Sequence, residues 1–187
     1  MDNKAIFLDR DGVLIKEVGY LGSVENAEFL PNVFSALKKI DISYALIIVS
    51  NQAGIAKGMY TEEDYKSVNT WLVDSLKEEG ILIAASYFCP HHPEASVEAY
   101  KKVCDCRKPG NGMLKKAEKD LNIDLKNSWM IGDKSSDILA GSKAGCKTIL
   151  VKTGYAGTDN AHVITPDYVA KTLTDAVDFI NSKKTVI

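Results

Sequence analysis

Short, mostly apolar runs alternate along the chain with longer segments in which apolar residues recur every three or four positions. The short runs have the length and composition of strands that are covered on both faces. We predict five such strands, over residues 5–8, 44–49, 84–88, 128–131 and 148–151. Because these runs contain no charged side chain, we expect the sheet they form to be buried.

The segments between the predicted strands have the pattern of amphipathic helices. Pro31 suits the first position of a helix. Thr61 and Asp64 have the spacing of a capping box, and Gly80 suits the end of the helix that they would open. We predict helices that begin at Pro31 and Thr61, and further helices over residues 112–121, 136–144 and 173–181.

Strands that alternate with helices are typical of a parallel α/β sheet with right-handed crossovers. We therefore expect a three-layer, Rossmann-like fold with helices on both faces of the sheet. The sequence shows no internal repeat, low-complexity segment or linker, so we predict a single domain over residues 1–187. In such sheets, ligands bind at the carboxyl ends of the strands, and functional residues are expected there.

Composition narrows the class of protein. The 187 residues are 45% hydrophobic and 26% charged, as in a globular protein. No apolar run approaches the roughly 18 residues that span a bilayer, and the first residues show no secretory pattern. The formal net charge of −2 gives no general attraction to nucleic acid or to an anionic membrane. We expect a cytoplasmic monomer that acts on a small molecule.

Two carboxylates follow the first predicted strand. Asp9 and Asp11 are two residues apart, and Gly12 follows them where the chain leaves the sheet. One carboxylate can attack an electrophile while the other transfers protons, provided that a cation reduces their mutual repulsion. An isolated Asp-x-Asp is common in solvated turns, so the pair indicates chemistry only if reactive residues also stand at the ends of other strands.

Polar and charged residues do stand at those ends. The second strand ends in Ser50, Asn51 and Gln52, which suit phosphoryl oxygens. The cations Arg107 and Lys108 precede a predicted helix. The fourth strand runs into Asp133 and, four residues later, Asp137, and carboxylates are the ligands that magnesium prefers. These elements, in this order, are not expected by accident.

Together these motifs resemble those of the haloacid dehalogenase superfamily of phosphatases, over residues 6 to about 157. The resemblance implies that Asp9 is the nucleophile and Asp11 the general acid and base. It implies that Ser50 and Lys108 stabilise the transferring phosphoryl group. Magnesium would be held by the carboxylates of Asp9 and Asp133 and by the backbone carbonyl of Asp11. The role of Asp137 stays open between orienting Lys108 and orienting a metal-bound water.

A second constellation contains cysteine and histidine. Cys89 precedes the pair His91 and His92, and Cys104 and Cys106 follow. Three thiolates and one imidazole make a tetrahedral structural zinc site, although this spacing is less specific than paired Cys-x-x-Cys motifs. Disulfides or free thiols are the alternative interpretation, and from the residues alone either histidine could be the fourth ligand.

The segments FLDRDG, SNQAGIAKG, CPHHP, CDCRKP and GDKSSD are similar to those of the D-glycero-D-manno-heptose 1,7-bisphosphate 7-phosphatases and the related histidinol-phosphatases. This resemblance implies a zinc-bound loop with His91 as the ligand, and no large cap domain. It also implies a set of residues that contact the substrate. These are Glu17, Val18, Gly19, Tyr20, Ser50, Asn51, Gln52, Ala53, Arg107 and Lys134.

The sequence thus predicts a magnesium-dependent phosphomonoesterase that removes the 7-phosphate of a heptose bisphosphate. Histidinol phosphate is the alternative substrate. A zinc-binding scaffold that recognises phosphate without catalysis is an alternative of another class, but it would not require an acid at Asp11. A polynucleotide phosphatase is disfavoured by the net charge and by the absence of a basic stripe.

Overall fold

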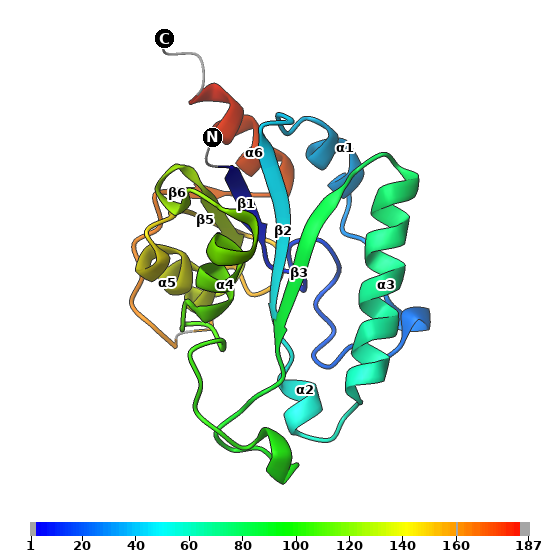
Figure 1. Cartoon of the computed structure of the whole chain (residues 1–187). Coiled ribbons are helices and arrows are strands. Elements are labelled where there is room, and N and C mark those ends of the chain that lie inside the picture. Colours follow the sequence, from blue (N-terminus) through cyan, green and yellow to red (C-terminus); the bar gives the residue numbers. More distant parts are fainter. Residues whose placement is uncertain (1–2, 160, 184–187) are drawn as a thin grey trace.

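A parallel β-sheet forms the centre of the computed structural model, which describes residues 3–159 and 161–183. Its strands are β1 (Lys4–Leu8), β2 (Tyr44–Asn51), β3 (Ile83–Cys89), β4 (Trp129–Gly132), β5 (Lys147–Val151) and β6 (Tyr168–Ala170). They lie in the order β3-β2-β1-β4-β5-β6, and every pairing between them is parallel (Figure 1). The chain therefore starts in the middle of the sheet and builds outward in both directions.

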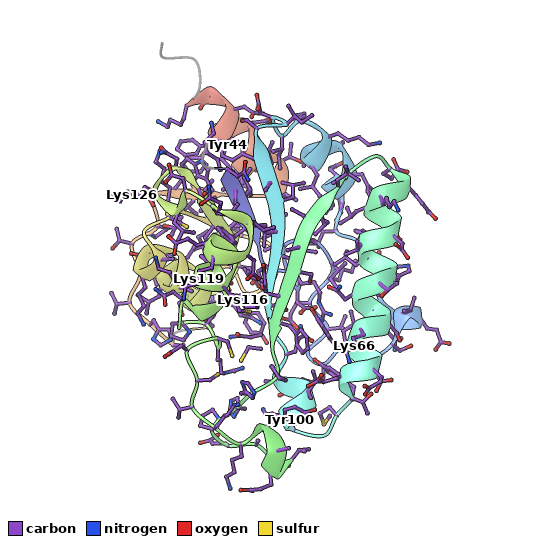
Figure 2. All side chains as sticks on the ribbon, viewed as in Figure 1. Tyr44, Lys66, Tyr100, Lys116, Lys119 and Lys126 are labelled. Atoms are coloured by element: carbon purple, nitrogen blue, oxygen red, sulfur yellow. The ribbon has the colours of Figure 1, made fainter. Side chains whose placement is uncertain are left out.

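Helices cover both faces of the sheet. They are α1 (Val33–Lys38), α2 (Ala53–Ala56), α3 (Glu62–Glu78), α4 (Gly112–Leu121), α5 (Ser135–Ala144) and α6 (Leu173–Ser182), with short 3₁₀ turns η1 (Val24–Asn26), η2 (Glu98–Tyr100) and η3 (Leu125–Asn127). In Figure 2 the labelled Lys66 on α3 and Lys116 on α4 lie on opposite sides of β2 and β3, and both are exposed.

Alternate residues of β1 enter two separate apolar cores, as the period of a strand requires. Ile6 and Leu8 pack with residues of α1, α3 and α6, whereas Ala5 and Phe7 pack with residues of α4. The predicted three-layer parallel α/β fold is confirmed.

Most predicted elements are present, with small shifts of their ends. The capping box at Thr61 is confirmed, because its hydroxyl accepts from the Asp64 N–H while the Asp64 carboxylate accepts from the Thr61 N–H. The predicted helix start at Pro31 is wrong. Asn32 has a φ of 64°, which a right-handed helix cannot include, and the helix begins at Val33. The elements β6 and α2 were not predicted.

The carboxyl ends of the strands lie together at one edge of the sheet, at the bottom of Figure 1. The segment between β3 and α4 (green) extends from this edge and contacts α2 through η2. Within this segment the structure describes only the short helix η2, so the segment forms no large cap domain. No helix within residues 3–159 and 161–183 is both long and apolar enough to cross a membrane.

Candidate active site

The predicted catalytic residues converge where β1, β2 and β4 end. Asp9 follows β1 directly, and its N–H donates to the Ile131 carbonyl of β4 at 3.0 Å. Ser50 belongs to the last residues of β2, and Asp133 follows β4. Asp9, Ser50 and Asp133 are all buried. The parallel topology therefore assembles residues that are more than a hundred positions apart in the sequence.

Lys108 supplies the positive charge at this edge. Its Nζ lies 2.7 Å from Asp9 Oδ1 and 2.7 Å from Asp137 Oδ1, and it donates to the Val49 carbonyl at 2.7 Å. Burial alone would lower the pKa of Lys108, but the carboxylates of Asp137 and Asp9 outweigh burial and raise it. The ammonium group is thus a fixed cation. Its ion pair with Asp137 fits the predicted option in which Asp137 orients Lys108.

Asn51 positions the backbone of Lys108. Its side-chain Nδ2 donates to the Lys108 carbonyl at 2.9 Å, and its Oδ1 accepts from the Lys108 N–H at 2.9 Å. Both polar atoms of this amide are therefore engaged by the loop that carries the cation. The contact joins the end of β2 to the loop before α4.

Asp133 lies at the bottom of the site, in contact with two glycines. A Cβ on Gly12 or on Gly154 would lie 2.4 or 2.2 Å from Asp133 Oδ2, so neither position has room for a side chain. Oδ2 accepts from the Tyr155 N–H at 2.7 Å, whereas Oδ1 is buried without a hydrogen-bond partner among the described residues. The close packing holds the Asp133 carboxylate in one place.

Asp133 belongs to a group of three buried acidic side chains. Asp9, Asp133 and Asp137 each offer a carboxylate oxygen, and these oxygens lie within 4.8 Å of one another. Burial and the neighbouring carboxylates raise the pKa of Asp133 to about 8. Burial and the negative charge of Asp9 raise the pKa of Asp137 to about 6, although the positive charge of Lys108 acts to lower it. Three buried carboxylates whose oxygens converge in this way form an arrangement that fits a hard divalent cation.

Asp11 faces the same recess but is held by a neighbouring cation. Arg10, which is 1% exposed, donates to Asp11 Oδ2 and Oδ1 at 3.0 Å. Burial raises the pKa of Asp11, while the charge of Arg10 opposes that shift. A carboxyl group with a raised pKa suits the donation of a proton near neutral pH.

Two adjoining hollows contain most of the predicted site residues. The inner recess, of about 30 Å³, is lined by Asp9, Asp11, Ser50, Asn51, Lys108, Lys134, Ser136 and Asp137. The outer pocket, of about 520 Å³, shares Asp11, Asn51, Lys108, Lys134 and Ser136 with the recess. Its other predicted residues are Glu17, Gly19, Tyr20, Gln52, Ala53 and Arg107.

Apart from the predicted zinc ligands, two predicted residues lie outside these linings. Val18 is 52% exposed and is not among the residues that line either hollow. Asp133 lies beneath the recess and is fully buried. The outer pocket also contains residues that sequence reasoning did not single out, among them Arg10, Tyr60, Tyr155 and Asp159. Only Arg10 had a signal in the sequence, since it stands between the two aspartates that were predicted to be catalytic.

Ion pairs brace the rim of the outer pocket. Lys134 Nζ lies 2.8 Å from Glu17 Oε2 and 4.3 Å from the centre of the Tyr155 ring. The other oxygen of Glu17 accepts from the Gly19 N–H at 2.8 Å. Lys57 donates to the Tyr20 hydroxyl at 2.7 Å. The 17–20 loop is thereby tied to both sides of the pocket.

The predicted cysteine cluster is present at the end of β3. One ligand atom from each of Cys89, His91, Cys104 and Cys106 lies within 4.8 Å of the others. His91 Nδ1 is 3.6 Å from the Cys89 sulfur and 3.4 Å from the Cys106 sulfur. All the cysteines are free, so the disulfide alternative is wrong in this structure. Three sulfurs and one imidazole nitrogen that converge in this way match the donor set of a structural zinc site.

Arg107 links this cluster to the pocket. Its Nη1 donates to the His91 carbonyl at 3.3 Å, and its side chain lines the outer pocket beside Lys108. The position of both cations thus depends on the loop that the cysteines close.

Comparison with known proteins identifies a matching family model and relatives of this chain. A family model described as HAD-hydrolase-like matches residues 105–176. The D-glycero-beta-D-manno-heptose-1,7-bisphosphate 7-phosphatase of Haemophilus ducreyi is 44% identical over 97% of this chain and 100% of its own length. The D-glycero-alpha-D-manno-heptose-1,7-bisphosphate 7-phosphatase of Photorhabdus laumondii is 47% identical over 81% of this chain and 84% of its own length.

A solved structure shares the fold along nearly the whole chain. The D,D-heptose 1,7-bisphosphate phosphatase of B. bronchiseptica, crystallised with magnesium and phosphate, superposes with a TM-score of 0.84 at 26% identity. The match covers 96% of this chain and 99% of that one. The chain therefore belongs to the family of the D-glycero-D-manno-heptose-1,7-bisphosphate 7-phosphatases, within the haloacid dehalogenase-like hydrolases.

Proposed function

We propose that this protein is a phosphomonoesterase that removes the 7-phosphate of D-glycero-D-manno-heptose 1,7-bisphosphate. One observation carries the proposal. The recess lined by Asp9, Asp11 and Lys108 adjoins a pocket of about 520 Å³ whose lining includes Arg107 and Lys134. The recess suits the reacting phosphoryl group, and the outer cations suit a second phosphate on the same sugar.

The reaction proceeds in two steps. A carboxylate oxygen of Asp9 attacks phosphorus, the bond from phosphorus to the ester oxygen breaks, and Asp11 protonates the leaving alkoxide. Asp11 then takes a proton from water, which attacks the phosphorus of the aspartyl-phosphate. The bond to Asp9 breaks, and inorganic phosphate and the free carboxylate are released. Lys108 and Ser50 stabilise the charge on the phosphoryl oxygens in both steps.

Two metal ions complete the proposal. Asp9, Asp133 and the backbone carbonyl of Asp11 would hold magnesium, which reduces the repulsion between the anionic nucleophile and the anionic phosphate. Support comes from the buried, unpartnered Oδ1 of Asp133 and from the magnesium in the structure of the B. bronchiseptica relative. Cys89, His91, Cys104 and Cys106 would hold zinc, which fixes the loop that carries Arg107 and Lys108.

The domain organisation, oligomeric state and cellular location of the enzyme are also part of the proposal. We propose one domain over residues 1–187, because all the described strands belong to one sheet. We propose a monomer, because this chain by itself supplies the predicted nucleophile, the predicted acid and both sets of predicted metal ligands. A cytoplasmic location fits a site that requires reduced thiols, and the small negative net charge fits a sugar phosphate as partner more than nucleic acid or a membrane.

Substrate comparison tests the proposal. The purified protein is assayed with magnesium on the alpha and beta anomers of the heptose bisphosphate, on histidinol phosphate and on nitrophenyl phosphate. We expect kcat/KM to be highest for a heptose bisphosphate, and Asp9→Asn to abolish turnover of all substrates while the protein stays folded. A higher kcat/KM for histidinol phosphate would assign the alternative substrate. Phosphate binding without turnover would assign the scaffold.

A further inference from the structure

A buried network of hydrogen bonds lies behind the recess, at the end of β2. It contains Gln52 and Ser50, each 1% exposed, together with Arg10, Asp11 and Tyr60. Gln52 is at the centre of this network, because both polar atoms of its side chain contact other members. The direction of these hydrogen bonds determines whether the Ser50 hydroxyl can donate a hydrogen bond into the recess.

The orientation of the Gln52 amide is set by its neighbours. Arg10 Nη2 lies 3.2 Å from one polar atom of the amide, and a guanidinium group has only donors. That atom must therefore be the acceptor, Oε1. The Tyr60 hydroxyl lies 2.6 Å from the same atom and must donate to it. On the opposite side, Nε2 donates to the carboxylate of Asp11 at 3.3 Å, which agrees with the same orientation.

This orientation determines the hydrogen bond at Ser50. Gln52 Nε2 lies 2.6 Å from Ser50 Oγ, and an amide nitrogen of this kind is only a donor. Ser50 must therefore accept from Gln52, so that its own proton is available to another acceptor. Because Ser50 lines the recess with Asp9 and Lys108, a phosphoryl oxygen in the recess would be that acceptor.

Tyr60 is held firmly enough to fix the amide. A Cβ on Gly54 would lie 2.1 Å from the Tyr60 ring, and one on Gly22 would lie 2.5 Å from Tyr60 Cβ. The ring thus packs directly against the backbone at two glycines. Burial raises the pKa of Tyr60, so that its hydroxyl keeps the proton that it donates.

We infer that Tyr60 and Arg10 hold the Gln52 amide in one orientation, and that Gln52 thereby fixes Ser50 as a hydrogen-bond donor to the phosphoryl group. In this arrangement Tyr60, Arg10 and Gln52 are positioning residues that act through Ser50. The inference rests on the proposed phosphatase function.

A double-mutant cycle tests the inference. Tyr60→Phe removes the hydroxyl and keeps the ring. We expect it to lower kcat/KM roughly three- to tenfold with nitrophenyl phosphate and with the heptose bisphosphate alike, as the loss of one hydrogen bond predicts. In a Ser50→Ala background the same change should have no further effect. Tyr87→Phe, whose hydroxyl donates to Asp120 outside the pocket, is the matched control and should leave kcat/KM unchanged.

A second readout does not depend on turnover. The wild type, both single variants and the double variant are titrated with inorganic phosphate in magnesium buffer by calorimetry. The inference is supported if Tyr60→Phe weakens phosphate binding in the wild-type background but has no effect on phosphate binding in the Ser50→Ala background. Equal losses in both backgrounds, or no loss, would overturn it. If the wild type hydrolyses no phosphate ester, the proposed function fails, while the phosphate titration still decides the inference.

Discussion

The ammonium group of Lys108 lies 2.7 Å from Asp9 Oδ1, and the two side chains are only 2% and 6% exposed. The predicted nucleophile is therefore also the buried counterion of the cation that the reacting phosphoryl group would meet. A pair of this kind contributes to both stability and catalysis, because removal of one partner leaves the other charged and buried.

Lys108→Met should damage both properties. We expect kcat to fall by at least about 100-fold, because one group that stabilises the transition state is lost. We also expect the free energy of unfolding to fall by about 3–5 kcal/mol, because the buried carboxylates lose their counterion. Kinetics and chemical denaturation measure the two effects. The control is Lys116→Met, which removes an exposed ion pair with Asp120 and should change neither. A Lys108→Met protein of wild-type stability would contradict the ion-pair argument.

Asp11→Asn should reveal a general acid through the leaving group. An asparagine cannot protonate an alkoxide, whereas nitrophenolate leaves without a proton. The loss in kcat should therefore be much larger for a sugar phosphate than for nitrophenyl phosphate. Equal losses for the two substrates would show that Asp11 does not protonate the leaving group.

Magnesium should stabilise the protein more at high pH than at low pH. The folded-state pKa values of Asp133 and Asp137, about 8 and about 6, lie above the ordinary carboxyl value, so the folded state binds more protons than the unfolded state. Without metal, stability should therefore decrease as the pH rises from about 4 to about 8. A cation that binds the ionised carboxylates would reverse this loss.

The measurement is the difference in Tm between magnesium and a chelator, at about pH 5.5 and about pH 8.5. We expect a larger difference at the higher pH. Asp133→Asn is the matched variant, since Asp133 has the higher pKa of the two carboxyl groups and its removal should flatten the pH dependence. A magnesium effect that is the same at both pH values would show that Asp133 does not hold the ion.

Zinc should be bound by the cysteine cluster. Metal analysis of the purified protein should find about one zinc ion per chain, as expected for one tetrahedral site. The double variant Cys104→Ser/Cys106→Ser should lose this zinc, with a lower Tm. Cys146→Ala is the control, because Cys146 is buried in the same apolar core as Cys89 but is not one of the four converging ligand residues. A wild-type protein that is folded and active without zinc would refute the assignment.

Arg107 and Lys108 should affect substrates differently, although they are neighbours in the sequence. Arg107→Ala should lower kcat/KM for the heptose bisphosphate much more than for nitrophenyl phosphate, because a guanidinium group can bind a second phosphate through two hydrogen bonds. Lys108→Ala should lower both alike. Arg107→Lys should not restore the bisphosphate preference, because an ammonium group lacks that geometry.

The hydrogen bond from Arg107 to the His91 carbonyl suggests an alternative role for Arg107, in which it only stabilises the loop. If Arg107 only braces the loop, its replacement by alanine should lower kcat/KM for both substrates by the same factor. The ratio of the two losses therefore separates substrate recognition from bracing.

The sequence predicted the mostly buried strands β1, β2, β4 and β5, because such strands need continuous apolar runs. It also predicted β3 as a buried strand, but β3 is an edge strand whose residues are mostly half-buried. It did not predict β6, a three-residue edge strand in which Val169 is 45% exposed. It also missed α2, which is too short to show a helical period. At the start of α1, the left-handed conformation of Asn32 overrode the preference of Pro31 for a first helical position.

The site was predictable where its residues follow strands, because the topology of a parallel sheet brings strand ends together. The role of an amide was not predictable. Asn51 and Gln52 both appeared suited to phosphoryl oxygens, yet Asn51 binds the backbone of Lys108, and Gln52 contacts Arg10 and Tyr60. Such partners depend on contacts between distant segments, and no local pattern encodes them.

The three buried charges Asp9, Lys108 and Asp137 also constrain how this protein can diverge. Since Lys108 is the counterion of both carboxylates, replacing it first during evolution leaves a destabilised intermediate that selection removes. A descendant that abandoned catalysis for another task would therefore have to exchange the trio nearly together, or keep it unused. Persistence of these residues in a lineage can thus reflect inherited stability as well as retained chemistry.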